Sequence, residues 1–150
     1  MVVIKGVHVG IAICEDVWHP GVAEASRAAG AELLLSLNAS PLHLNKQGVR
    51  HQVVRERAMA TRMSIVFANL IGGQDELIFD GASFAMDGDG TLTHQLEAFA
   101  EALVVVEFAN GRLVPGVIAA ALSDEAEVYA ALQLGVRDYV GKNGFPGVII

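Results

Sequence analysis

The sequence contains one cysteine, few aromatic residues and little positive charge. The single cysteine, Cys14, excludes an internal disulfide and fits a reducing compartment such as the cytoplasm. Lys and Arg total 10 residues against 17 Asp and Glu, which gives a formal net charge of −7. Without a basic block, nucleic acid is not expected as the main partner, although backbone amides can still bind a nucleotide.

Long hydrophobic runs are also absent. Charges or turn residues interrupt each apolar stretch before the roughly 18 residues that a membrane span needs. The first six residues lack the basic lead and apolar region of a secretory signal. We therefore expect no membrane partner. Of the 150 residues, 53% are hydrophobic, so the chain can bury a core and is not expected to be disordered.

The apolar pattern predicts alternating strands and helices, followed by a β-meander and a final helix and strand. Strands are predicted at residues 2–4, 7–13, 31–37, 64–70, 77–79, 82–86, 91–96, 102–108 and 148–150, and helices at 22–29, 46–63 and about 123–142, with a loop at 71–76. This order is typical of an α/β layer structure. Polar groups at Cys14, at residues 38–40 and at Asn69 follow three of the strands, and we expect them to meet along one sheet edge.

The two longest predicted helices each carry an apolar stripe. In the helix at 46–63, Val49, Val53 and Met59 recur at helical spacing. The last helix carries its stripe at Val128, Leu132, Val136 and Val140, with Ser123 as N-cap. Four arginines occupy other faces of the first of these helices, which indicates a solvated face or a subunit contact rather than a phosphate site: Arg50, Arg55, Arg57 and Arg62.

Cys14 stands where a buried strand gives way to a polar loop. Free cysteines are often buried in cores, which is the competing interpretation of a lone cysteine. Here, however, two carboxylates, Glu15 and Asp16, follow at once, and a packing cysteine has no need of them. A thiol at a strand end is partly exposed and held rigidly from behind, as an attacking nucleophile must be.

The segment from Ile13 to Trp18, Ile-Cys-Glu-Asp-Val-Trp, resembles the nucleophile segment of the nitrilase (carbon–nitrogen hydrolase) superfamily. Residues 69–81, which include Gly-Gly-Gln-Asp-Glu-Leu and Phe-Asp-Gly, resemble more narrowly the glutaminase domain of glutamine-dependent NAD synthetases. The resemblance implies a nitrilase α-β-β-α sandwich, present in part, followed by the helix and first strand of a second α/β domain. It places the first domain at residues 1–119 and the start of the synthetase domain at 120–150.

The resemblance also assigns roles to single residues. Cys14 would form a γ-glutamyl thioester, with the N–H of Glu15 helping to hold the oxyanion. Ser40 and Lys46 would contact the amino-acid end of glutamine, where a hydroxyl and a cation suit a carboxylate, and Glu15 would face the α-ammonium. From the residues alone, Ser40–Pro41 also fits an ordinary turn and Lys46 an ordinary helix start.

Two further catalytic groups of the superfamily, a glutamate and a lysine, come from segments before the cysteine. Here Lys5 and Glu15 are the local candidates, and neither matches the family position. The full family uses ATP and magnesium to make NAD, but the resemblance places the ATP loop after this chain, so no cofactor is expected here. The five histidines lack metal-ligand spacing, and no metal site is expected.

The resulting hypothesis is glutamine amide hydrolysis that supplies ammonia for amidation of nicotinic acid adenine dinucleotide. The chain would represent an internal part of such an enzyme, without the N-terminal half and the rest of the synthetase domain, and is expected to be inactive alone. Two alternatives remain, a stand-alone amidase of the nitrilase superfamily and a non-catalytic assembly module. A half-sandwich exposes apolar strands, so a homo-oligomer is expected.

Overall fold

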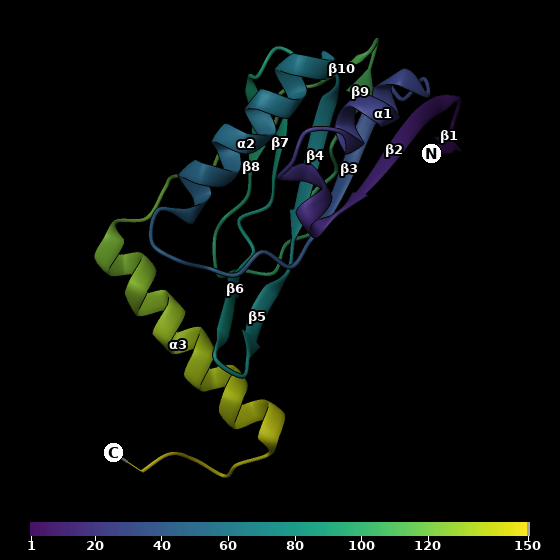
Figure 1. The fold of residues 1–150 in the computed structure, drawn as a ribbon. Helices are drawn as coiled ribbons and strands as arrows, with labels where there is room; N and C mark the ends of the chain where they lie inside the picture. The colour runs from purple at the N-terminus through teal and green to yellow at the C-terminus, as the bar shows by residue number, and fades with distance from the viewer. Residues whose placement is uncertain (150) are drawn as a thin grey trace.

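The computed structural model describes residues 1–149, in which a six-stranded sheet has the strand order β1-β2-β3-β4-β7-β8 (Figure 1). Strands β2, β3 and β4 are parallel, and the other neighbours pair antiparallel. The strands of this sheet are β1 (Val2–Ile4), β2 (Val7–Ile13), β3 (Leu33–Asn38), β4 (Ser64–Asn69), β7 (Phe84–Met86) and β8 (Leu92–Gln95).

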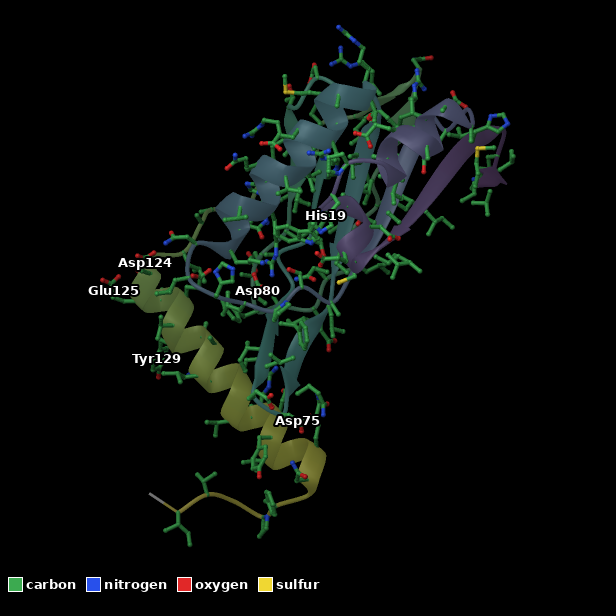
Figure 2. The ribbon with its side chains drawn as sticks, in the orientation of Figure 1. His19, Asp75, Asp80, Asp124, Glu125 and Tyr129 are labelled. Carbon is green, nitrogen blue, oxygen red and sulfur yellow. The ribbon has the colours of Figure 1, made fainter. Side chains whose placement is uncertain are left out.

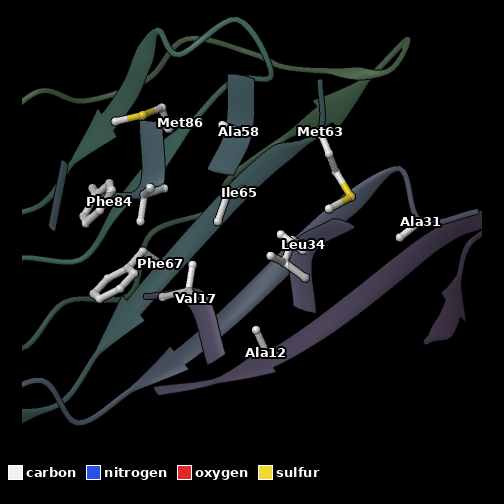
Figure 3. Packing of buried hydrophobic residues seen from close by; sticks show 12 residues of the cluster. Ala12, Val17, Ala31, Leu34, Ala58, Met63, Ile65, Phe67, Phe84 and Met86 are labelled. Carbon is white, nitrogen blue, oxygen red and sulfur yellow. The ribbon is translucent and has the colours of Figure 1, made fainter. Parts of the chain in front are cut away.

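Helices α1 (Val22–Ala28) and α2 (Lys46–Thr61) are the crossovers between the parallel strands, and both cover the same face of the sheet (Figure 1). Gly10 allows α1 to approach β2 closely, because a Cβ there would lie 3.0 Å from the Ser26 Cβ. Between the helices and the sheet lies the main hydrophobic core (Figure 3), which includes Ala12, Val17, Leu34, Val54, Ala58, Ile65, Phe67, Phe84 and Met86.

The opposite face of the sheet is covered at one end only. Beyond β8, the amide of Gly116 donates to Thr93 O, and a Cβ at Gly116 would overlap the His94 ring. At the carboxyl ends of β2 and β3 the same face is open, and Ile13 and Leu37 are 64% and 53% exposed. The predicted α/β class is therefore confirmed, with one helix layer and one sheet layer of the sandwich in the described residues.

A second unit extends from the edge of the sheet. Strands β5 (Ile71–Gln74) and β6 (Leu77–Asp80) form a hairpin, and helix α3 (Asp124–Asn143) packs along it (Figure 1). Ser123 caps α3 as predicted, since its hydroxyl accepts from the Ala126 amide. No helix in residues 1–149 is long and apolar enough to cross a membrane. A short hairpin of β9 (Phe108–Ala109) and β10 (Arg112–Leu113) completes the described elements.

Three predicted segments are wrong or only partly right. Residues 71–76, predicted as a loop, contain β5, because the two glycines there allow the close approach of α3 that the hairpin needs. Residues 102–108, predicted as a strand, contribute only their last residue to β9. Val148 and Ile149 are not in a strand, and Ile150 of the same prediction lies outside the described residues.

The buried faces of two helices also differ from the prediction. In α2, Val49 and Met59 are 41% and 55% exposed, whereas Arg50 and Val54 are fully buried. In α3, the predicted stripe is largely exposed, and Leu134 is the residue that the helix buries. In α2, the face that carries Arg50 is buried because acceptors from distant segments surround its guanidinium. The spacing of apolar residues alone does not reveal these acceptors.

Candidate active site

The carboxyl ends of β2, β3 and β4 meet at one edge of the sheet, as predicted. In register, Ile13 pairs with Leu37, and Asn38 pairs with Asn69. Cys14 therefore directly follows the last residue of β2 and lies next to the carboxyl ends of β3 and β4. This is the place where parallel α/β sheets bind ligands.

Cys14 opens a single 3₁₀ turn, η1 (Cys14–Val17), in an unusual backbone conformation. Its φ of 48° lies in the left-handed region, which a residue with a side chain adopts only where its surroundings hold it. Two contacts hold it here: the Ile13 amide donates to Asp16 Oδ2 at 2.8 Å, and the Trp18 amide donates to Glu15 O at 3.0 Å. The thiol is free and partly exposed, so the site combines strain, rigidity and access.

Neither local candidate for a base or cation lies at Cys14. Lys5 occupies the β1–β2 turn, at the opposite end of the seven-residue β2 strand. The Glu15 carboxylate contacts His19 Nε2 at 3.0 Å, and both side chains are about three-quarters exposed, at 76% and 73%. In residues 1–149 no hydrogen bond reaches the Cys14 sulfur, so any base has to approach from elsewhere.

Ser40 is only 3% exposed and is held on two sides. From β4, Asn69 Oδ1 accepts from the Ser40 amide at 2.9 Å, and Asn69 Nδ2 donates to the Ser40 carbonyl. From α2, Arg50 Nη2 donates to the same carbonyl at 2.7 Å and Arg50 Nε to the Ser40 hydroxyl at 3.2 Å. The segment after β3 is thus fixed in place, and Ser40 sits within it rather than projecting freely.

Lys46 lies at the start of α2 and faces the segment that follows Cys14. Its Nζ is 4.3 Å from the centroid of the Trp18 ring, which is a cation–π contact. Asn45, just before it, has a φ of 62°, so the chain turns sharply into the helix. Of the predicted site residues, the structure therefore brings Lys46 next to the cysteine loop, while the Glu15 side chain points into solvent.

Arg50 and Asp80 are the pair that the sequence did not reveal. Arg50 was predicted on a solvated face, and this is wrong: its guanidinium is buried and forms a two-point ion pair with Asp80, at 2.8 and 2.9 Å. Asp80 was predicted to lie between the strands at 77–79 and 82–86, but it ends β6 and is 1% exposed. In Figure 2 it lies where the hairpin meets the sheet, with Asp75 at the far turn. The sequence offered one signal of a buried charge here, since this aspartate directly follows the apolar residues 77–79.

A polar cluster lies beside this pair. His51 Nε2 contacts Gln95 Oε1 at 2.8 Å, and its ring packs edge-on against Phe84 at 4.6 Å. Burial lowers the pKa of His51, with the charges of the neighbouring arginines acting in the same direction. A cavity of about 280 Å³ opens next to it, lined also by Glu127, whose pKa is raised by burial first and by the charge of Asp80 second. This cluster has no counterpart in the sequence-based prediction.

The described part of the chain holds no group of three or more His, Cys, Asp or Glu side chains placed to bind a metal ion.

The chain is similar to several known proteins in sequence and in fold. The carbon-nitrogen hydrolase family profile matches residues 1–115. The glutamine-dependent NAD(+) synthetase of Rhodobacter capsulatus is 43% identical over 148 residues, which are 96% of this chain and 27% of that protein. A structure of the glutamine-dependent NAD+ synthetase of Acinetobacter baumannii with ADP superposes with a TM-score of 0.91 at 37% identity, over 97% of this chain and 28% of that one. A nitrilase-superfamily amidase from Nesterenkonia gives a TM-score of 0.58 at 25% identity, over 64% and 36%.

The chain therefore belongs to the carbon-nitrogen hydrolase family. Within that class, the predicted similarity to glutamine-dependent NAD synthetases is confirmed over nearly the whole chain. The chain spans about a quarter of the length of such relatives, 27% in the Rhodobacter capsulatus protein.

Proposed function

We propose that this chain carries the thiol nucleophile of a glutamine-dependent NAD synthetase. The observation that carries the proposal is the placement of Cys14: a partly exposed thiol, in a left-handed conformation, at the carboxyl end of a parallel strand. The similarity to NAD synthetases supports glutamine as the substrate. Ammonia released at Cys14 would serve the amidation of nicotinic acid adenine dinucleotide elsewhere in the enzyme, in the cytoplasm.

The proposed reaction has two stages. The Cys14 sulfur attacks the side-chain amide carbon of glutamine, the thiol proton passes to the amide nitrogen, the C–N bond breaks, and ammonia leaves. Water then hydrolyses the γ-glutamyl thioester and releases glutamate and the thiol. The first amides of a helical turn have no acceptor within the turn, and Glu15 stands at that place in η1, which supports a role of its amide in holding the oxyanion.

Ser40, Lys46 and Glu15 are proposed to bind the amino-acid end of glutamine. Lys46 supplies a cation beside the cysteine loop, which suits the α-carboxylate. Ser40 contributes a fixed hydroxyl at the neighbouring strand end. Glu15 would leave its exposed contact with His19 to reach the α-ammonium.

Turnover by the 150-residue chain alone is not expected. A thiol needs a base and an oxyanion donor, and residues 1–13 contain no glutamate, while Lys5 is remote. ATP and magnesium belong to the amidation step of the family, and no step assigned to this chain uses them. We also propose that the chain self-associates through the open face of its sheet, where Ile13 and Leu37 are exposed.

The test is the intact mass of the protein after incubation with an electrophilic glutamine analogue, a diazomethyl ketone. We expect one adduct, which is lost in Cys14→Ala and suppressed by an excess of L-glutamine. Steady ammonia release by the purified chain would contradict the expected inactivity. A folded chain that forms no adduct would contradict the role of Cys14 as an accessible nucleophile in this protein.

An amidase acting on other small amides is the second candidate, because the Nesterenkonia amidase shares the fold at 25% identity. The two candidates differ in what protects Cys14. Protection by acetamide but not by L-glutamine would favour the amidase. Protection by L-glutamine alone would favour the glutaminase role.

A further inference from the structure

Arg50 is a fully buried cation in which every donor is used. Its five N–H groups make five hydrogen bonds: two to Asp80, one to Gln47, one to the Ser40 carbonyl and one to the Ser40 hydroxyl. Asp80 neutralises the charge at 2.8 Å. The guanidinium therefore joins three parts of the chain that are distant in sequence, namely α2, the end of β6 and the segment after β3.

This arrangement is more specific than stability alone requires. A buried ion pair is often no more stabilising than packed apolar residues of the same volume, because both charges lose their hydration. Such a pair does fix geometry, since the planar guanidinium offers its donors in set directions. Two of those directions end on Ser40, a residue proposed to bind substrate.

The contact with Arg50 also determines whether the Ser40 hydroxyl acts as a donor or as an acceptor toward a ligand. Because Ser40 Oγ accepts from Arg50 Nε, the hydroxyl keeps its own proton free to donate. A donor next to a guanidinium suits an acceptor that carries negative charge, such as a carboxylate. Asn69 Oδ1 accepts from the Ser40 amide, so the backbone of Ser40 is held on a second side. This contact keeps the Ser40 hydroxyl next to Arg50.

We propose that Arg50 is a positioning residue of the glutamine site, which acts through Ser40 and is itself held in place by Asp80. This inference rests on the proposed function of Cys14 and Ser40. Arg50 does not touch the substrate. It fixes the segment after β3 against the Cys14 edge of the sheet and presents the Ser40 hydroxyl as a donor to the bound amino acid.

The test compares two reagents on wild type and Arg50→Lys. Lysine keeps the charge but has three donors and no planar fork, so it cannot hold Asp80 and Ser40 together. We expect the half-saturating concentration of the diazomethyl ketone analogue to rise at least about tenfold, the effect of releasing one charge-assisted hydrogen bond. The rate of Cys14 alkylation by iodoacetamide, which needs no amino-acid site, should stay within about twofold of the wild-type rate, since Arg50 makes no contact with the thiol.

Arg62→Lys is the matched control, since Arg62 is an exposed arginine directly after the same helix. It should leave the half-saturating concentration of the analogue and the rate of alkylation by iodoacetamide unchanged. Where Arg50→Lys fails to fold by circular dichroism, Asp80→Asn provides a second variant, because it keeps one of the two acceptor oxygens but removes the charge and the second acceptor that orient Arg50. It should raise the half-saturating concentration in the same direction.

Two results would overturn the inference, and a third would overturn the proposed function. A folded Arg50→Lys protein with unchanged half-saturation, or one in which both reagents slow equally, would show that Arg50 does not position the binding segment. Wild-type labelling that neither saturates nor responds to L-glutamine would instead remove the glutamine site itself. The wild-type measurement alone thus separates failure of the function from failure of the positioning role.

Discussion

Lys46 Nζ lies 4.3 Å above the ring of Trp18, and this contact joins the start of α2 to the loop that follows the cysteine. Lys46 is the cation proposed to bind the substrate carboxylate, and Trp18 comes four residues after Cys14. The aromatic ring therefore determines where that cation stands relative to the thiol.

Trp18→Leu should weaken binding of the glutamine analogue without removing the thiol's reactivity. A cation–π contact of this kind is worth about 0.5–1 kcal/mol at a partly exposed site, so the half-saturating concentration should rise about two- to fivefold. Trp18→Phe keeps an aromatic ring, so its half-saturating concentration should lie between those of wild type and Trp18→Leu. If Trp18→Leu and wild type saturate alike, Lys46 does not depend on the ring.

Val54→Ala and Val49→Ala test which face of α2 is buried. Val54 is 0% exposed, so its truncation should lower the free energy of unfolding by about 1.5–3 kcal/mol. Val49 is 41% exposed, and its truncation should change stability by no more than about 0.5 kcal/mol. Urea unfolding of both variants measures the difference. Equal losses would contradict the observed register of the helix.

Acidification should destabilise the protein through His51. Burial lowers the pKa of His51 from 6.5, so the unfolded chain takes up this proton before the folded chain does. The contribution of His51 to stability is therefore fully present above pH 6.5 and is lost as the pH falls through the folded pKa. Burial lowers the pKa of His94 as well, so it adds to the same slope.

The measurement is the unfolding midpoint between about pH 7 and pH 5, above the range in which ordinary carboxyl groups titrate. His51→Gln should show a shallower fall than wild type. His43→Gln, at an exposed histidine, controls for the loss of one histidine. An unchanged slope in His51→Gln would mean that the ring is accessible to protons in the folded chain.

Asp138 should anchor α3 to the β5–β6 hairpin in a pH-dependent way. The Gly73 amide donates to Asp138 Oδ2 at 2.8 Å, and this hydrogen bond lowers the pKa of the carboxyl group. The ionised form is therefore the bound form, and its contribution is present above the unfolded pKa near 3.8 and lost as pH falls below that range.

Hydrogen exchange of the Gly73 amide, expressed as a protection factor, measures this anchor. Protection should decrease in acid for wild type and become independent of pH in Asp138→Asn. Arg137→Gln changes the neighbouring charge but leaves the acceptor, and so should retain the pH dependence. Acid-insensitive protection in wild type would show that the carboxylate charge is not needed.

Replacing Ile11 should reduce self-association. Ile11 lies on β2 and is 44% exposed, on the uncovered face of the sheet with Ile13 and Leu37. Ile11→Lys places a charge on that face and should shift the mass measured by light scattering toward the monomer. Leu44→Lys, at a residue 55% exposed outside the sheet, is the control. A monomeric wild type would remove the proposal of an oligomer through this face.

The main elements were predictable because their signals are local. Apolar runs bounded by turn residues indicated β2, β3 and β4, and Ser123 marked the start of α3. The cysteine loop was recognisable because a thiol followed by two carboxylates fits no apolar strand. The strand predicted at 102–108 failed because residues 116–119 pair with the outer edge of β8 instead.

The sequence by itself determined the α/β class, the family resemblance and the position of Cys14 at a strand end, because periodicity and motif spacing are properties of neighbouring residues. Only the tertiary structure decided which face of α2 is buried, that Asp80 meets Arg50 across 30 residues, and that both hold Ser40. The physical reason is that burial of a charge depends on whether a partner from a distant segment neutralises it, and no local pattern records that partner.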